Sequence, residues 1–228
     1  MKQPVVDYRT FRLKRIKEPQ FSHLKYLLGW VGYFALYFLT ENLIPAQTCH
    51  VVHCALDDRI PFCELFLIPY VVWYLLVAGS LLYFALYDPE RFKELMIYII
   101  VTQVVAMAVY ILWPSRQDLR PETFARDNIL TRGVALLYQI DTSTNVCPSL
   151  HVAYSLGLLS VWWKDKQASR LWQVVLVVWV VLICLSVSFI KQHSVLDILA
   201  ALPVCLLAEG ITYGRDYWYP RLRKKRSV

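Results

Sequence analysis

Charged residues are scarce in this chain of 228 residues, at 18% against about 25% in an average soluble domain. Apolar residues make up 57%, which excludes a disordered chain because such chains lack the apolar surface to fold. Seven glycines and six cysteines are too few for a collagen-like repeat or a small disulfide scaffold. Internal repeats and low-complexity segments are also lacking. Because the apolar residues occur in long runs, a soluble enzyme with one core is disfavoured.

Six apolar runs have the length of membrane-spanning helices, which need about 20 mostly apolar residues. Three runs carry no charge, namely Leu65–Leu86, Leu95–Trp113 and Leu171–Ile190. The other three contain a few polar groups: Tyr26–Ile44, Val146–Trp163 and Val195–Tyr213. None of the six alternates as a barrel strand does. We therefore expect an all-α, multi-pass bundle of six transmembrane helices.

The distribution of Lys and Arg predicts the orientation of the bundle. With six spans both termini share one side, which carries 18 of the 24 basic residues. Basic loops favour the cytoplasm, so both termini are expected on the cytoplasmic side. The protein itself is expected in the cell membrane. The N-terminus lacks the apolar core of a cleavable signal peptide. We divide the chain into a basic cytoplasmic segment 1–25, a membrane domain 26–213 and a basic cytoplasmic tail 214–228.

The net charge of +7 does not indicate a nucleic-acid partner, because the basic cytoplasmic loops account for it. Four arginines nevertheless lie in the outer loop 114–145, where positive charge is disfavoured. They are Arg116, Arg120, Arg126 and Arg132. A phosphate group is the ligand that arginines outside the cytoplasm would suit best. A short helix is expected in the same loop, around Arg132 to Tyr138.

His193 and Asp197 are four residues apart, at the expected start of the sixth span. On a helix they share one face. The carboxylate can fix the imidazole tautomer and leave the second nitrogen as a nucleophile. An interfacial histidine beside a snorkelling carboxylate is the plainer interpretation.

The segment Pro148-Ser149-Leu150-His151 marks the outer end of the fourth span. Proline suits the first turn of a helix, and free N–H groups with a serine hydroxyl there form an anion site. His151 could protonate a departing oxygen. A plain helix start with an interfacial histidine is the alternative.

Together these segments resemble the type 2 phosphatidic acid phosphatase superfamily over residues 110 to 210. Its three blocks read Lys-x6-Arg-Pro, Pro-Ser-x-His and Ser-Arg-x5-His-x3-Asp. Arg120-Pro121 matches the end of the first block, and the second block matches completely. Ser186, His193 and Asp197 match the third.

The chain departs from this pattern at two cations. Trp113 stands at the first-block Lys and Val187 at the third-block Arg. Arg116 and Lys191 are the nearest substitutes in sequence. Loss of the third-block Arg resembles the inositol phosphorylceramide synthase and sphingomyelin synthase branch. The segments Leu56–Phe62 and Pro69-Tyr70-x-x-Trp73-Tyr74 resemble bacterial members of that branch.

The resemblance implies covalent chemistry without a metal or other cofactor. His193 would form a phosphohistidine, Asp197 would orient it, and His151 would act as acid and then base. Arg120, Ser149 and either Lys191 or Arg116 would bind the phosphoryl oxygens.

A lipid phosphatase is the expected function. Phosphatidate, phosphatidylglycerol phosphate, an isoprenyl diphosphate and a phosphodiester headgroup donor remain open as substrates, and the oligomeric state is open. A lipid headgroup phosphotransferase of the inositol phosphorylceramide synthase kind is the alternative. A small transporter with Asp197 and Glu209 as relay groups, and a catalytically inactive scaffold, are the alternatives of other classes.

Four cysteines fall on the outer side: Cys49, Cys54, Cys63 and Cys147. A disulfide Cys49–Cys54 or Cys54–Cys63 is conceivable outside the cytoplasm, and free thiols are the alternative. Cys49, His50, His53 and Cys54 superficially suggest zinc, although their spacing fits no familiar zinc pattern.

Overall fold

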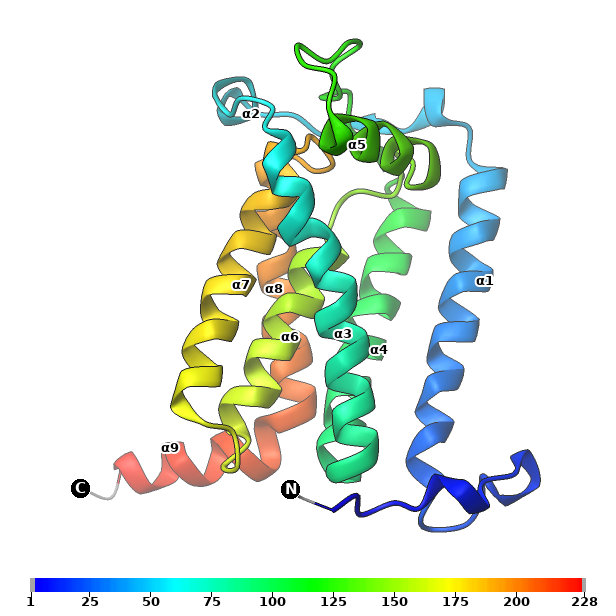
Figure 1. Ribbon diagram of the computed structural model, residues 1–228, viewed down its shortest axis with the longest axis vertical. Coiled ribbons are helices and arrows are strands. Elements are labelled where there is room, and N and C mark those ends of the chain that lie inside the picture. Colours follow the sequence, from blue (N-terminus) through cyan, green and yellow to red (C-terminus); the bar gives the residue numbers. More distant parts are fainter. Residues whose placement is uncertain (1–2, 227–228) are drawn as a thin grey trace.

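The computed structural model describes residues 3–226 and is built almost entirely of helices. The first and last two residues of the predicted terminal segments lie outside this range. Six long helices run side by side along one axis of the described part (Figure 1). They are α1 (Leu28–Leu43), α3 (Leu67–Tyr87), α4 (Pro89–Leu112), α6 (Leu150–Lys164), α7 (Arg170–Phe189) and α8 (Val195–Tyr213). The expected all-α bundle is therefore confirmed.

Within residues 3–226, four helical stretches are long and apolar enough to cross a membrane. They are Glu64–Tyr87, Pro89–Leu112, Arg170–Phe189 and Val195–Arg223. The first includes the short helix η5 (Glu64–Phe66) that leads into α3. The helices α1 and α6 are shorter, with 16 and 15 residues, although η3 (Ser22–Leu27) extends α1 by a 3-10 segment. The four apolar helices indicate a membrane protein.

Local capping determines where the helices of the site begin. The Ser194 hydroxyl accepts a hydrogen bond from the backbone N–H of Leu196, so α8 begins at Val195 and His193 lies just before it. Ser149 is the N-cap of α6. Pro148 therefore lies before the helix, and our placement of it in the first turn was wrong. The Cys147–Pro148 peptide bond is cis, and the backbone bends at these two residues before α6 begins.

The helix α6 occupies the middle of the bundle and packs against α3, α4, α7 and α8. Its side chains Leu158 and Val161 are fully buried. Gly157 allows α6 to approach α4, since a Cβ atom there would lie 2.7 Å from the Tyr98 ring. By contrast α1 packs mainly against α4, and this peripheral position leaves one side of α3 uncovered.

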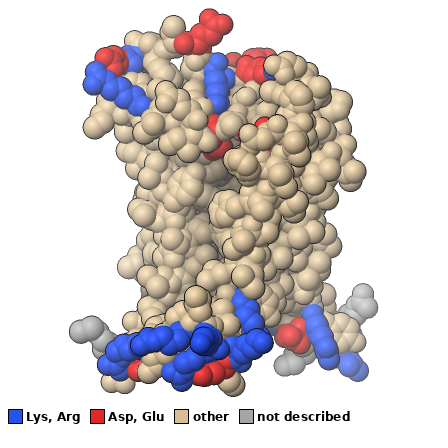
Figure 2. All heavy atoms as spheres, turned by 90° about the vertical axis from the view of Figure 1, so that its right-hand side faces the viewer, with Lys and Arg blue, Asp and Glu red and all other residues tan. Residues whose placement is uncertain are grey.

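The two ends of the bundle differ in charge. The N-terminal helices η1 (Tyr8–Thr10) and η2 (Leu13–Arg15) lie at the same end as η6 (Gly214–Trp218) and α9 (Tyr219–Arg226) (Figure 1). Figure 2 shows Lys and Arg gathered in a band at this end, below an uncharged middle zone. At this end Glu209 of α8 pairs with Lys164 of α6 at 2.6 Å, so this ion pair joins the two helices.

The opposite end carries the short elements that surround the site. They are η4 (Ala46–Thr48), β1 (His50–Val51), α2 (Ala55–Arg59), β2 (Ser115–Arg116) and α5 (Ile129–Ile140). The two strands pair in parallel, with His50 opposite Ser115. The helix α5 confirms the short helix predicted in this loop.

Candidate active site

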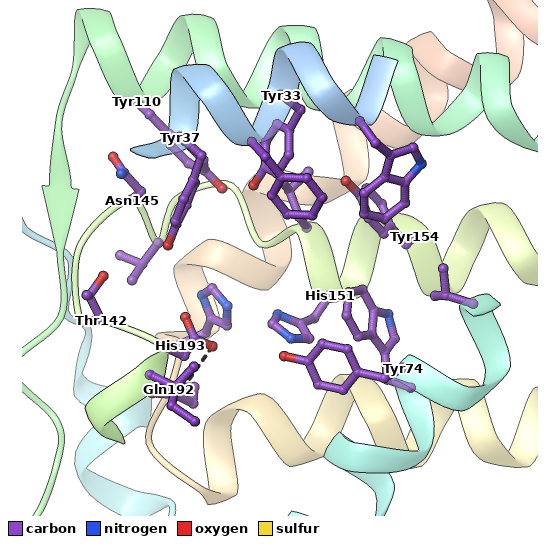
Figure 3. A pocket seen from close by; sticks show the side chains of 18 of the residues that line it. Tyr33, Tyr37, Tyr74, Tyr110, Thr142, Asn145, His151, Tyr154, Gln192 and His193 are labelled. Carbon is purple, nitrogen blue, oxygen red and sulfur yellow. Dashed lines mark hydrogen bonds between the residues drawn. The ribbon is translucent and has the colours of Figure 1, made fainter. Parts of the chain in front are cut away.

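The structure brings His151, His193 and Asp197 together at the end of the bundle that carries α5. His193 Nδ1 lies 3.1 Å from Asp197 Oδ2, which confirms the contact expected from their spacing. This contact leaves Nε2 of His193 as its second nitrogen. The rings of His151 and His193 have centroids 5.7 Å apart and lie beside each other in Figure 3. The arrangement therefore presents a carboxylate-oriented imidazole to a second imidazole.

Aromatic rings of α3 hold the His151 side chain in place. Its ring centroid lies 4.5 Å from that of Tyr70 and 4.3 Å from that of Trp73. His151 Nε2 is buried and has no hydrogen-bond partner within residues 3–226. Buried polar atoms are normally paired, so an unpaired imidazole nitrogen beside a second histidine suits proton transfer to a ligand.

Ser149 presents a second unpaired polar atom to the same region. Its hydroxyl is fully buried and has no partner in the described part of the chain. Its backbone N–H donates to the Asp197 carbonyl oxygen at 3.1 Å, which links the start of α6 to the start of α8. A helix N-terminus with a free hydroxyl can bind an anion. Ser149 is not among the residues that line the cavity described next, and its role stays a prediction.

Both histidines line a cavity of about 610 Å³ between α1, α3 and α6 (Figure 3). Near the histidines its wall is polar and includes Asp141, Thr142, Asn145 and Gln192. Farther along, the wall is aromatic and apolar and continues toward the other end of the bundle. These residues are Leu27, Trp30, Tyr33, Phe34 and Tyr37 of η3 and α1, and Trp73, Tyr74, Val77, Ala78 and Leu81 of α3. Leu27, Phe34 and Tyr74 are also exposed on the outside, so the cavity opens sideways between α1 and α3.

The predicted phosphate-binding cations do not line this cavity. Arg120 donates to the carbonyl oxygens of Tyr138, Asp141 and Thr142 and to Gln192 Oε1 at 2.5–3.1 Å. Burial lowers the pKa of the Arg120 guanidinium, although the Asp141 charge opposes this shift. Arg120 therefore supports the polar wall from behind through Gln192, the neighbour of His193.

Lys191 and Arg116 also have protein partners. Lys191 Nζ donates to the carbonyl oxygens of Asp57 at 2.8 Å and Ile60 at 2.5 Å, and burial lowers its pKa. Its backbone is left-handed, with φ 56°, and its ammonium group contacts the segment around α2. Arg116 pairs with Asp118 at 3.1 Å. Sequence distance from His193 was therefore a poor guide to where the Lys191 side chain lies.

Two carboxylates near the histidines were missed by sequence reasoning. Asp141 Oδ2 accepts hydrogen bonds from the Tyr70 hydroxyl at 2.6 Å and the Gln192 side-chain amide at 3.1 Å. Asp57 accepts from the Ser194 hydroxyl at 2.6 Å. Each partner lies at least 51 residues away in sequence, and no local pattern indicates such pairs. The segment Leu56–Phe62 was noted only for its resemblance.

The cysteines form no site in the structure. All six are free thiols, so neither candidate disulfide among Cys49, Cys54 and Cys63 is formed. Within residues 3–226 no group of three or more His, Cys, Asp or Glu side chains is placed to hold a metal ion. His50 instead stacks on the Trp113 ring, with centroids 5.1 Å apart, and His53 pairs with Asp58 at 2.8 Å.

Comparison of the chain with protein-family models, with curated proteins and with solved structures finds no match.

Proposed function

We propose that the protein is an integral membrane phosphatase that cleaves lipid phosphate esters through a phosphohistidine intermediate. The observation that carries the proposal is the buried His193–Asp197 pair facing His151 at the head of a sideways-open apolar cavity. In this proposal α1, α3, α4, α6, α7 and α8 all cross the membrane, and the basic end lies in the cytoplasm. The histidines then lie at the extracytoplasmic side of the cell membrane.

The chemistry proceeds in two steps with balanced protons. His193 Nε2 attacks phosphorus while the ester P–O bond breaks, and His151 gives its proton to the departing oxygen. Asp197 accepts a hydrogen bond from the N–H of His193 Nδ1 and stabilises the positive charge that develops on the ring. His151 then takes a proton from water as the water oxygen bonds to phosphorus, and the P–N bond breaks. The N-terminus of α6, with Ser149, receives the phosphoryl oxygens.

The shape of the cavity supports a lipid as the substrate. Leu27 and Tyr37 both line its α1 wall, and ten residues of helix correspond to about 15 Å. An acyl or isoprenyl chain can lie along this wall while its phosphate reaches the histidines. Phosphatidate, phosphatidylglycerol phosphate, an isoprenyl diphosphate and a phosphodiester lipid all satisfy this requirement.

Headgroup transfer to a second lipid alcohol is the second candidate, and one observation favours it. Among residues 3–226, those that line the cavity include the carboxylate of Asp141 and no Lys or Arg. Burying a dianionic phosphate monoester beside a carboxylate costs several kcal/mol unless cations compensate it. A phosphodiester carries one negative charge and is easier to accommodate. In that reaction an alcohol replaces water in the second step, and the protons move as before.

A lipid panel on the purified protein tests the proposal. The protein in neutral detergent is incubated with phosphatidate, phosphatidylglycerol phosphate, an isoprenyl diphosphate and phosphodiester lipids, with and without a lipid alcohol. Released phosphate indicates hydrolysis, and a new phospholipid indicates transfer. The matched variants are His193→Ala and His53→Ala, because His53 is an exposed histidine at the same end of the bundle.

We expect His193→Ala to lose activity and the acid-labile phosphoenzyme, while His53→Ala keeps both. Activity of His193→Ala above a few per cent of wild type contradicts the covalent mechanism. A wild-type protein that turns over no member of the panel contradicts the proposed function as a whole.

A further inference from the structure

The short helix α2 is hydrogen-bonded to the turn that carries His193. Asp57 on α2 accepts hydrogen bonds from the Ser194 hydroxyl at 2.6 Å and the Val195 N–H at 2.8 Å. In the opposite direction, Lys191 Nζ donates to the carbonyl oxygens of Asp57 and Ile60. Four hydrogen bonds thus join residues that are more than 130 positions apart in sequence.

Asp57 is buried, and its charge is well compensated. Only 2% of its surface is exposed. Burial raises the pKa of its carboxyl, but the hydrogen bonds from Ser194 and from the Val195 and Cys54 N–H groups outweigh burial and leave the pKa below 3.8. The group is therefore a carboxylate at neutral pH. A carboxylate at the N-terminus of α8 also suits the helix dipole.

The backbone N–H groups from His193 to Leu196 all have acceptors within the protein. The Val195 N–H is bound by Asp57, the Leu196 N–H by Ser194 Oγ, and the Ser194 N–H by Asp197. The His193 N–H donates to the Val187 carbonyl oxygen at 2.9 Å. The N-terminus of α8 therefore has protein carboxylates where an anion would bind, and the unpaired Ser149 hydroxyl lies at the N-terminus of α6.

We propose that Asp57 is a positioning residue for His193, which it holds toward His151 through Ser194 and Val195. The proposal rests on the function proposed above. Asp57 acts on the turn, and it is not among the residues that line the cavity. Because a reacting group displaced by about 1 Å can lose roughly 10²-fold in rate, loosening this turn lowers the rate of phosphoryl transfer to His193. Substrate binding depends mainly on the cavity wall and changes little.

The variant Asp57→Asn and the matched control Asp58→Asn test the assignment. Asp58 is the next residue, but it is exposed and pairs with His53. Asparagine keeps the size of the side chain and one acceptor oxygen, while its amide nitrogen cannot accept the bond that the second carboxylate oxygen accepts. We expect kcat and the rate of phosphoenzyme formation to fall roughly 10- to 100-fold in Asp57→Asn. KM is expected to change less than about threefold, and Asp58→Asn to behave as wild type.

A double-mutant cycle distinguishes positioning from a general loss of stability. Ser194→Ala removes the partner of Asp57, so the double variant with Asp57→Asn is expected to lose little more kcat than the worse single variant. Arg132→Ala removes an exposed ion pair with Asp127 and is expected to be additive with Asp57→Asn. All rates are normalised to folded protein, measured by gel filtration and thermal unfolding.

A wild-type kcat per folded Asp57→Asn molecule overturns the positioning role, as does full additivity with Ser194→Ala. Both results leave the proposed function intact if His193→Ala is inactive. An active His193→Ala variant instead rejects the proposed function, so the two failures are distinguishable.

Discussion

Replacing Lys191 with methionine separates two roles for its ammonium group. The sequence predicted that it binds the phosphoryl group, whereas in the structure it donates to the carbonyl oxygens of Asp57 and Ile60. Methionine keeps the length and apolar character of the side chain and removes the charge and both hydrogen bonds. Arg126→Ala is the matched control, because Arg126 is an exposed cation at the same end of the bundle, paired with Glu64.

The expected loss of stability follows from the two hydrogen bonds. Each bond from a charged group contributes about 1.5–3 kcal/mol, and a buried carbonyl left without a partner costs about 1–3 kcal/mol. Lys191 is only 9% exposed, so removing its charge offsets part of this loss, because the desolvation of the ammonium group is no longer needed. We therefore expect Lys191→Met to lower the free energy of unfolding by about 2–4 kcal/mol, and Arg126→Ala to change it little.

Thermal unfolding and steady-state kinetics on the same preparations provide the test. Lys191→Met is expected to unfold at a lower temperature and to lose kcat, with KM nearly constant, because the turn before His193 is less firmly held. A roughly 10²-fold loss of kcat/KM with unchanged thermal stability would refute this reasoning. That result would assign Lys191 to the phosphoryl group, as the sequence predicted.

Three further predictions concern other parts of the molecule. Activity is expected to persist in EDTA, since no metal takes part in the proposed steps; loss on chelation and recovery with magnesium or zinc would contradict this. Gly157→Ala is expected to destabilise the bundle by about 1–3 kcal/mol, because its Cβ meets the Tyr98 ring. Gly210→Ala, which meets nothing within 4 Å, is expected to unfold at the wild-type temperature or above. Because the pKa of Asp57 is lowered from 3.8, its contribution to stability is complete above 3.8 and is lost as the pH falls through the lower folded value. Thermal unfolding between about pH 2 and 5 should therefore show a smaller acid loss in Asp57→Asn than in wild type.

The sequence determines the helices well because their signal is local. Long uncharged runs such as Leu171–Ile190 can satisfy their backbone in a membrane only as helices, and α7 agrees within one residue at each end. The His193–Asp197 contact was predictable for the same reason, since four residues correspond to about one helical turn. Helix starts were less predictable, as at Pro148, which lies before the first residue of α6.

The surroundings of the histidines depend on contacts that no local pattern contains. Asp57 reaches Ser194 across 137 positions, and Tyr70 reaches Asp141 across 71. Proximity in sequence to His193 also does not indicate where the Lys191 side chain lies. Its left-handed backbone and its two carbonyl partners hold the ammonium group at α2, and side-chain length alone cannot predict this.

The sideways opening between α1 and α3 has a consequence for how turnover is measured. A molecule that enters through the flank of the bundle never passes through bulk water, so its effective concentration is a mole fraction in the surrounding lipid or detergent. Adding neutral detergent at constant total substrate should then lower the rate, because it lowers the mole fraction of substrate in the detergent phase. Saturation curves become comparable between laboratories only when they are expressed per mole of amphiphile.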